Sequence, residues 1–370
     1  MKVATILGTR PEIIKLSRVI KLFEDSTNHF IINTNQNFNK KLNDYFFDEL
    51  GLKKPKYNLK CNDKNFAKTI SNILSKVDAV LEKERPDAVL IYGDTHSGLS
   101  AIVAKKRKIP IFHMEAGNRC FDQNVPEEIN RKIIDSISDI NIVLTENARN
   151  YLISEGFPQN KIFNVGSFVP EISLAYQNKI NNSKILKKLS ILKNNYILAS
   201  IHREENLDLN NNLDSIIKSL SQVSKAHKKK IILSTHPRTK EKIKKNKIKY
   251  DKNNITLSEP FGYFDYIKLA QNSYVSISDS GTIVEDCVSY GFKAIMLRET
   301  NERPEGFDNG NIYMVSPKAK NLSHLINLLK DSKASINLEQ YSRNINVSNK
   351  ILKIVLSYKD FVNKYSWLKK

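Results

Sequence analysis

Cysteine is scarce in this chain of 370 residues, and long apolar runs are missing from it. Its three cysteines, Cys61, Cys120 and Cys287, are far apart, which excludes the disulfide framework of a small secreted protein. The apolar run at residues 3–7 is too short for a signal peptide, and no run approaches the roughly 18–20 residues of a membrane span. We therefore expect a protein of the reducing cytoplasm that has no contact with a membrane.

Metal-binding spacings and interleaved aromatic residues are also lacking. The seven histidines form neither His-x-His nor His-Glu-x-x-His, and the acids form no Asp-x-Asp, so we expect no metal and no other cofactor. The net charge of +20 suggests a nucleic-acid partner. However, the most basic stretch, residues 225–249, holds ten lysines and no Tyr, Phe or Trp on which bases could stack. We expect solvated helix faces, no nucleic acid, and a general attraction for anionic substrates.

Apolar, β-branched runs alternate with helical spacing along most of the chain, which predicts the α/β class with parallel sheets. The first series has strands at residues 2–7, 30–34, 87–92, 109–114, 140–144 and 161–165, with helices such as 66–84, 97–108 and 126–138 between them. Residues 170–195 break this rhythm, and residues 178–193 within them are rich in Asn, Ser and Lys, which suggests a surface connection. A second series has strands at 196–201, 230–234, 255–257, 274–278 and 293–297. We predict two doubly wound domains, residues 1–168 and 169–350, facing a cleft.

Polar residues follow several strands just past their carboxyl ends, where open parallel sheets bind ligands. In the first half they are residues 8–10, Asp94 and Glu115. Glu115 belongs to a polar segment, 113–131, that also carries Arg119, Asp122, Glu127, Glu128 and Arg131. Carboxylates beside arginines suit acid/base chemistry on an anionic substrate, whereas a solvated loop before a capped helix is the simpler interpretation. Glu128 is expected at the surface, where it complements the helix dipole.

The second half offers a phosphate cradle. Ser280-Gly281-Thr282 lies between a strand and a helix, so its N–H groups and hydroxyls can hold a phosphate or simply cap the helix. Glu285 and Asp286 follow one turn later, where a carboxylate can accept hydrogen bonds from ribose. His202 at a strand end, and Arg303 in a later loop, can serve acid/base chemistry and diphosphate binding. These patterns together indicate a nucleotide-linked substrate.

Eight motifs in this order make the chain resemble the UDP-N-acetylglucosamine 2-epimerase family, over nearly its whole length. They are Gly8-Thr9-Arg10-Pro11-Glu12, Gly93-Asp94-Thr95, His113-Met114-Glu115-Ala116-Gly117, Pro126-Glu127-Glu128, Asn130-Arg131, His202-Arg203-Glu204, Asp279-Ser280-Gly281 and Glu302-Arg303-Pro304-Glu305. The resemblance implies the GT-B architecture, two Rossmann-like domains, with a last helix in residues 351–370 that packs back on the first. It implies a homodimer that binds a UDP-sugar and uses no metal or other cofactor.

The implied reaction inverts C2 of a UDP-linked 2-acetamido sugar. UDP leaves by anti elimination to give a 2-acetamidoglucal, and UDP then adds back with the C2 proton on the other face. By resemblance the acid/base set is Asp94, Glu115, Glu127 and His202. The groups implied to bind the phosphates, the ribose or the sugar are Arg10, Lys15, Arg119, Phe261, Tyr266, Ser280, Gly281, Thr282, Glu285, Asp286 and Arg303.

Several departures from the family pattern are similar to the branch that makes UDP-N-acetyl-L-fucosamine from UDP-2-acetamido-2,6-dideoxy-L-talose, for capsule, O-antigen or other lipopolysaccharide assembly in bacteria. The loop Gly117-Asn118-Arg119-Cys120-Phe121-Asp122 stands where the N-acetylglucosamine enzymes usually have Gly-Leu-Arg-Thr-Gly-Asp, and Phe261 replaces a polar residue. Asn35-Gln36-Asn37 replaces the Gly-Gln-His of the allosteric region. The alternatives are a UDP-N-acetylglucosamine 2-epimerase making UDP-N-acetylmannosamine, a hydrolysing epimerase, or a GT-B glycosyltransferase.

Overall fold

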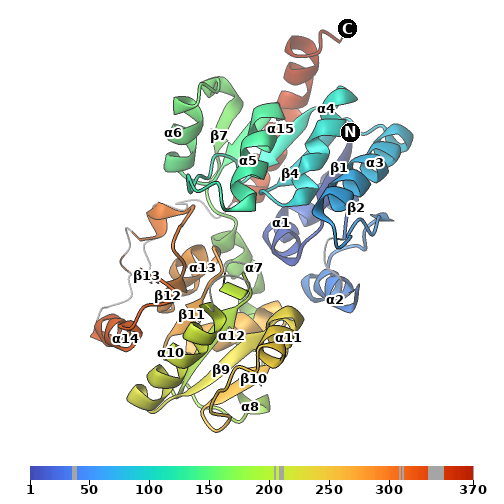
Figure 1. Cartoon of the computed structure of the whole chain (residues 1–370). Helices are drawn as coiled ribbons and strands as arrows, with labels where there is room; N and C mark the ends of the chain where they lie inside the picture. Colours follow the sequence, from blue (N-terminus) through green and yellow to red (C-terminus); the bar gives the residue numbers. More distant parts are fainter. Residues whose placement is uncertain are drawn as a thin grey trace. The chain divides into compact units, whose positions relative to one another are not determined.

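The chain forms two compact units, each built around its own parallel sheet (Figure 1). Unit 1 comprises Met1–Ile172 and Glu339–Lys370, and unit 2 comprises Ser173–Leu338. The structure is a computed structural model that describes residues 1–35, 40–203, 206–207, 212–307, 310, 312–331 and 346–369, without the side chains of 40–44, 330 and 331.

The seven strands of the unit 1 sheet are ordered β3-β2-β1-β4-β5-β6-β7, and all neighbours are parallel. Their bounds are β1 Lys2–Leu7, β2 Asn28–Asn33, β3 Tyr57–Asn58, β4 Ala88–Tyr92, β5 Ile111–Met114, β6 Ile140–Val143 and β7 Ile162–Asn164. The helices are α1 Arg10–Ser26, α2 Lys40–Leu50, α3 Phe66–Glu84, the 3-10 turn η1 His96–Ser100, α4 Ala101–Lys106, α5 Pro126–Ile137, α6 Glu146–Ser154, the 3-10 turn η2 Gln159–Lys161 and α15 Val347–Tyr365.

Helices cover the unit 1 sheet because their apolar residues recur at helical spacing. Ile73 and Val77 of α3 and Ile134 of α5 join the sheet residues in one buried cluster. The C-terminal helix α15 belongs to this unit and packs against α1.

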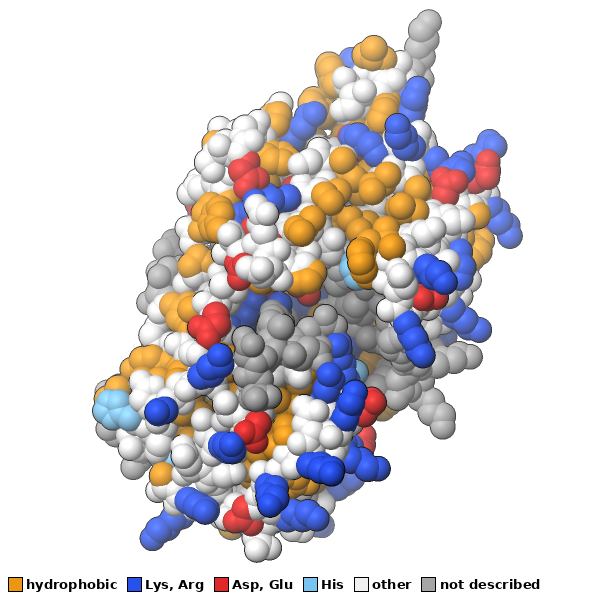
Figure 2. All heavy atoms as spheres, viewed as in Figure 1, with side chains coloured by type: hydrophobic (Ala, Val, Ile, Leu, Met, Phe, Trp, Pro, Cys, Tyr) orange, Lys and Arg blue, Asp and Glu red, His pale blue; other side chains and the backbone are white. Residues whose placement is uncertain are grey.

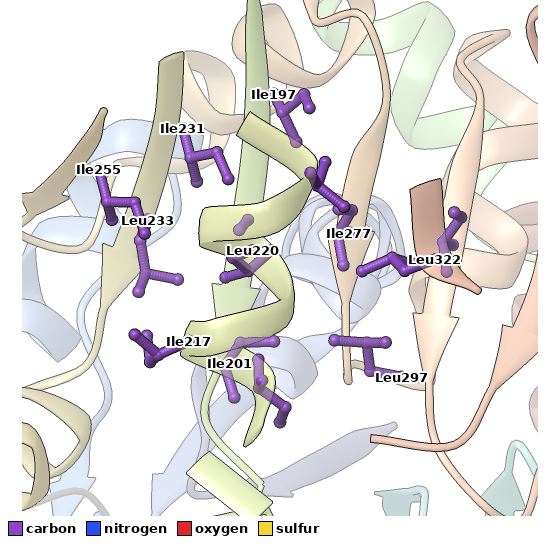
Figure 3. Close-up of a cluster of buried hydrophobic side chains, with 14 of the residues drawn as sticks. Ile197, Ile201, Ile217, Leu220, Ile231, Leu233, Ile255, Ile277, Leu297 and Leu322 are labelled. Carbon is purple, nitrogen blue, oxygen red and sulfur yellow. The ribbon is translucent and has the colours of Figure 1, made fainter. Parts of the chain in front are cut away.

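Unit 2 repeats the layout with a six-stranded parallel sheet in the order β10-β9-β8-β11-β12-β13. Its strands are β8 Tyr196–Ile201, β9 Lys230–Thr235, β10 Ile255–Ser258, β11 Ser276–Ser278, β12 Ala294–Leu297 and β13 Ile312–Val315. Its helices are α8 Ile185–Lys188, α10 Asn212–His227, α11 Pro237–Lys245, α12 Tyr263–Asn272, α13 Ile283–Tyr290, the 3-10 turn η3 Pro304–Gly306 and α14 Leu322–Asp331. Ile217 and Leu220 of α10 pack onto the sheet in the core drawn in Figure 3.

Several segments differ from the sequence-based expectation. Residues 170–195 are not a plain surface connection, because α7 (Val169–Asn181) and α8 occupy most of them. Ile172, Tyr176 and Ile180 of α7 lie four residues apart and are buried, which explains the helix. The helix expected at 97–108 is split into η1 and the shorter α4, and the short strands β3 and β13 were not predicted.

The charged side chains fit the expectation of solvated helix faces. α11 carries four lysines that are not buried, and Figure 2 shows Lys and Arg spread singly over the visible face of unit 2. No helix among the described residues is long and apolar enough to cross a membrane.

Candidate active site

In each sheet the strand order reverses at one point, and open α/β sheets bind ligands outside the strand ends there. In unit 1 this point lies between β1 and β4. A buried carboxylate, Glu12, bridges the turns after these two strands. It accepts hydrogen bonds from the N–H groups of Gly8 (2.7 Å) and Thr9 (2.6 Å), and from the hydroxyl of Thr95 (2.7 Å). Burial raises the pKa of Glu12, although these hydrogen bonds oppose the shift. Glu12 thereby fixes the turn that carries Asp94.

Asp94 is held by an ion-pair chain. Its Oδ2 lies 2.5 Å from Nη2 of Arg131, whose Nη1 lies 2.6 Å from Oε2 of Glu128. Glu128 also accepts the N–H groups of Cys120 (3.1 Å) and Phe121 (3.2 Å). The prediction that Glu128 lies at the surface is wrong, because its side chain is fully buried. It ties the polar loop to the first turn of α5.

Glu115 occupies a constrained position. Its backbone has φ +64°, in the left-handed region, and its side chain is only 8% exposed. The buried hydroxyl of Tyr92, from the neighbouring strand β4, donates a hydrogen bond to its carboxylate. Such strained residues persist where the surrounding structure holds them, and they are common at active sites.

Gly117 makes the turn after Glu115 possible. Its φ is +78°, and a Cβ there would come within 2.4 Å of the carbonyl oxygen of Ala148. The amide of Gly117 donates to Asp135 at 3.2 Å. No other residue type fits between this loop and α6.

Arg119 is buried beneath the same loop. Its Nη1 lies 2.8 Å from Asp135 Oδ2 and its Nη2 lies 2.6 Å from Glu155 Oε2. Asp135 also faces His113, whose Nδ1 lies 2.9 Å away, while Nε2 of His113 lies 2.8 Å from the carbonyl oxygen of Gly93. The buried guanidinium therefore contacts one buried carboxylate, Asp135, and one partly exposed carboxylate, Glu155.

The remaining candidates of unit 1 differ in how far their side chains are exposed to solvent. Arg10 is exposed at the start of α1, with its guanidinium 5.5 Å from the ring centre of Phe46. Lys15, one turn later, is only 4% exposed. Glu127 is half-buried in the first turn of α5, next to Glu128.

In unit 2 the expected phosphate cradle precedes α13. The hydroxyls of Ser280 and Thr282 lie 3.0 Å apart. A Cβ on Gly281 would come within 2.3 Å of Oε1 of Glu302 and 3.0 Å of Nη1 of Arg298, so a larger residue there would displace the ends of these side chains.

A buried cluster of charges lies under this cradle. Arg303 pairs with Glu285 (2.9 Å) and with Glu302 (2.6 Å), and Arg298 pairs with Glu302 (2.9 Å). Glu285 is buried in this cluster, whereas Asp286 is partly exposed. Sequence reasoning missed Arg298 and Glu302 as members of the site.

The strand order of unit 2 reverses between β8 and β11, and His202 and Asp279 follow these strands. The Nδ1 atom of His202 lies 3.1 Å from Oδ1 of Asp279. Phe261 is partly exposed just before α12, and Tyr266 is partly exposed within it. Glu204, Gln36 and Asn37, which were part of the sequence reasoning, lie outside the described residues. The described residues include no cluster of three or more His, Cys, Asp or Glu that could hold a metal ion.

Known proteins match this chain over nearly its full length. The family model described as UDP-N-acetylglucosamine 2-epimerase matches residues 21–356. The chain belongs to this family. It is therefore an isomerase of the non-hydrolysing 2-epimerase class.

Relatives and solved structures agree with this membership. A UDP-N-acetylglucosamine 2-epimerase of Methanocaldococcus jannaschii is 37% identical, with 90% of this chain and 93% of that protein covered. A UDP-2,3-diacetamido-2,3-dideoxy-D-glucuronate 2-epimerase of Pseudomonas aeruginosa is 34% identical, with 82% and 84% covered. The structure of a UDP-N-acetylglucosamine 2-epimerase from Rickettsia bellii covers 100% of both chains at 46% identity, with a TM-score of 0.90. The Methanocaldococcus jannaschii enzyme in complex with UDP-GlcNAc and UDP covers 96% and 99% at 35% identity and a TM-score of 0.90. The predicted pair of Rossmann-like domains is thus confirmed.

Proposed function

We propose that this enzyme epimerises UDP-2-acetamido-2,6-dideoxy-L-talose at C2 to UDP-N-acetyl-L-fucosamine, for capsule, O-antigen or other lipopolysaccharide assembly. The reaction removes the C2 proton as UDP departs from C1 by anti elimination. UDP then adds back at C1 while C2 takes a proton on the opposite face, which inverts C2. The proposed acid/base chemistry rests on the environment of Glu115. Its carboxylate is buried, its backbone is strained, and a tyrosine hydroxyl donates a hydrogen bond to it. Because C2–H is a weak acid, the leaving diphosphate also needs cations and N–H groups around it.

The proposed roles are those that the family resemblance implies, changed where the contacts of a side chain argue against them. Asp94, Glu115, Glu127 and His202 handle protons, and the cradle Ser280-Gly281-Thr282 binds the diphosphate together with Arg10, Lys15 and Arg303. Asp286 is assigned to the ribose, since the neighbouring carboxylate Glu285 is paired with Arg303. Arg119 is reassigned from substrate binding to holding the loop, because its side chain is fully buried against Asp135 and Glu155. Arg303 keeps its role because its Nη1, although paired with Glu302, borders the cradle at Gly281. Phe261 and Tyr266 remain proposed sugar contacts.

The choice of a 6-deoxy sugar rests on Phe121. Phe121 is 64% exposed, and its ring packs edge-on against Tyr151. The backbone of Phe121 has φ +58°. Positive φ is unfavourable for a residue with a bulky side chain, and such residues cluster at functional sites. We therefore assign this ring a role in substrate binding. An apolar ring suits a methyl group at C5 better than a hydroxymethyl group.

The test is incubation in D2O with UDP-2-acetamido-2,6-dideoxy-L-talose and, separately, with UDP-N-acetylglucosamine. We expect deuterium at C2 of the first sugar, detected by proton NMR, and little exchange in the second. Exchange in UDP-N-acetylglucosamine alone would favour the second candidate, which makes UDP-N-acetylmannosamine and is supported by the names of several relatives. Glu115→Gln should abolish exchange while UDP binding persists, which separates a lost proton transfer from a lost fold.

We also propose a homodimer formed through unit 1. Figure 2 shows hydrophobic side chains gathered on the face that carries α3, α4 and α5. The exposed apolar residues of these helices are Phe66, Ile102, Ile129 and Ile133. Replacing both Ile129 and Ile133 by Lys should give a monomer in light scattering, whereas Leu192→Lys, at a more exposed position of unit 2, should leave the assembly unchanged.

A further inference from the structure

The strand-order reversal of unit 2 places a buried carboxylate against a partly exposed histidine. Asp279 follows β11 and is fully buried, and His202 follows the paired strand β8 with 43% of its side chain exposed. Their facing atoms, Nδ1 of His202 and Oδ1 of Asp279, are 3.1 Å apart. The sequence-based site included His202 but gave no role to Asp279.

Asp279 also organises the turn that carries the histidine. Its Oδ2 accepts the N–H groups of His202 (3.0 Å) and Arg203 (2.9 Å) and the side-chain amide of Asn206 (3.1 Å). Burial by itself raises the pKa of the Asp279 carboxyl, but the charge of His202 and these donors outweigh it and hold the pKa below its ordinary value. Asp279 is therefore a carboxylate at neutral pH and can only accept hydrogen bonds.

This geometry determines which ring nitrogen of His202 carries a proton. An acceptor facing Nδ1 requires a hydrogen on Nδ1, and a neutral imidazole then has no hydrogen on Nε2. We propose that Asp279 is a positioning residue, which fixes the Nδ1-protonated form of His202 and aims Nε2 as a proton acceptor at the substrate. The proposal rests on the proposed epimerisation, because that reaction is what needs a proton acceptor here.

The competing explanation is that Asp279 only anchors the turn. Asn206 provides a matched control, since its amide donates to Asp279 and to the carbonyl oxygen of Leu297 (3.2 Å) without contacting the His202 ring. Asn206→Ala loosens the turn and leaves the pair of His202 and Asp279 in place. Asp279→Asn keeps an acceptor oxygen, but its amide can donate to Nδ1 and favour the reversed tautomer.

The first measurement is NMR of protein labelled with 15N-histidine, which distinguishes Nδ1 from Nε2 protonation. We expect the neutral wild-type His202 to carry its proton on Nδ1, and Asp279→Asn to shift it to Nε2. A wild-type ring protonated on Nε2 would overturn the proposal, whether or not any variant folds and whichever sugar turns over. Because this readout needs no substrate, it also separates failure of this proposal from failure of the proposed reaction.

The second measurement is steady-state epimerisation with UDP binding measured in parallel. General acid/base catalysis contributes about 10²- to 10⁴-fold, so Asp279→Asn should lower kcat by about 100-fold or more, with the Kd for UDP changed by less than about threefold. Asn206→Ala should lower kcat by less than about fivefold. In a His202→Ala background, Asp279→Asn should have no further effect, since it acts through the ring. Equal losses in Asp279→Asn and Asn206→Ala, or additive losses in the double variant, would make Asp279 a turn anchor alone.

Discussion

At the scale of single residues, the proposed catalytic carboxylates of unit 1 depend on neighbouring side chains that hold them in place. Tyr92 donates its hydroxyl to the buried Glu115 carboxylate and stacks edge-on against Phe168 at 5.4 Å. A hydrogen bond to a charged group is worth about 1.5–3 kcal/mol, which corresponds to roughly 10- to 100-fold in a rate. We predict that Tyr92→Phe lowers kcat by this factor and changes KM little, measured by steady-state epimerisation.

The control for this prediction is a second buried tyrosine. Tyr196 of unit 2 donates its hydroxyl to the carbonyl oxygen of Leu269 at 2.6 Å, and it contacts no proposed catalytic group. Tyr196→Phe should lower stability while kcat stays unchanged. Equal kcat in Tyr92→Phe and wild type would show that Glu115 does not need this donor.

The substitution Arg119→Lys tests whether Arg119 supports the loop rather than binding the substrate. Arg119→Lys keeps a charge but cannot contact Asp135 and Glu155 together, because lysine lacks the planar fork of guanidinium. Losing a partner in a buried ion pair costs about 3–5 kcal/mol. We therefore predict that the free energy of unfolding in urea falls by about 3 kcal/mol, while KM for the UDP-sugar stays nearly unchanged. Arg149→Lys, whose pair with Glu146 spans 3.9 Å at the surface, should have little effect. A large rise in KM with normal stability would restore Arg119 to the substrate.

At the scale of secondary-structure elements, a buried carboxylate joins the two turns at the strand-order reversal in both units. Glu12 joins the turns after β1 and β4, and Asp279 joins the turns after β8 and β11. The sequence predicts where the polar turns fall, because glycines and short polar runs follow apolar strands. It does not predict which carboxylate bridges them. The partner of Glu12 across the reversal, Thr95, is 83 residues away in the chain, and the partner of Asp279, His202, is 77 residues away.

The same limit explains the other errors. Glu128 was expected at the surface because Pro126 and the helix dipole already account for an acid there, yet its partners in the loop bury it. The helix α7 was missed because its polar second half hides the spacing of its apolar residues. Strand and helix types were predictable from local periodicity, whereas burial of charged side chains follows from tertiary pairing.

Glu84, at the end of α3, gives a pH-dependent prediction. Lys2 first, then Lys56 and Tyr57, donate to its carboxylate and lower its pKa to about 2 from 4.5. A carboxyl with a depressed pKa stabilises the fold above its ordinary pKa, and this contribution is lost as pH falls from about 4.5 through 2. The difference in unfolding free energy between wild type and Glu84→Gln should therefore shrink across this range. Glu82→Gln, an exposed neighbour on α3, should show a much smaller pH-dependent difference; a constant difference for Glu84→Gln would rule out this linkage.

At the scale of the whole molecule, the chain leaves unit 1 for unit 2 and returns through α15, so the stability of unit 1 depends on its last helix. Val347, Ile351, Val355 and Val362 of α15 are fully buried. The single tryptophan of the chain, Trp367, follows α15, with the Lys105 ammonium 5.1 Å from its ring centre. Tryptophan fluorescence therefore reports on unit 1 alone, whereas circular dichroism reports on both units.

We predict that Ile351→Ala destabilises unit 1 selectively. Removing a buried isoleucine costs about 2–5 kcal/mol, because the lost apolar burial adds to the cavity that remains. The fluorescence transition in urea should move to lower concentration, while a second transition seen by circular dichroism, from unit 2, should stay in place. Leu356→Ala, at a position of α15 that is 43% exposed, should move neither transition. If Ile351→Ala shifted both transitions together, the two units would unfold as one cooperative body, and α15 would have to be counted in the stability of unit 2 as well.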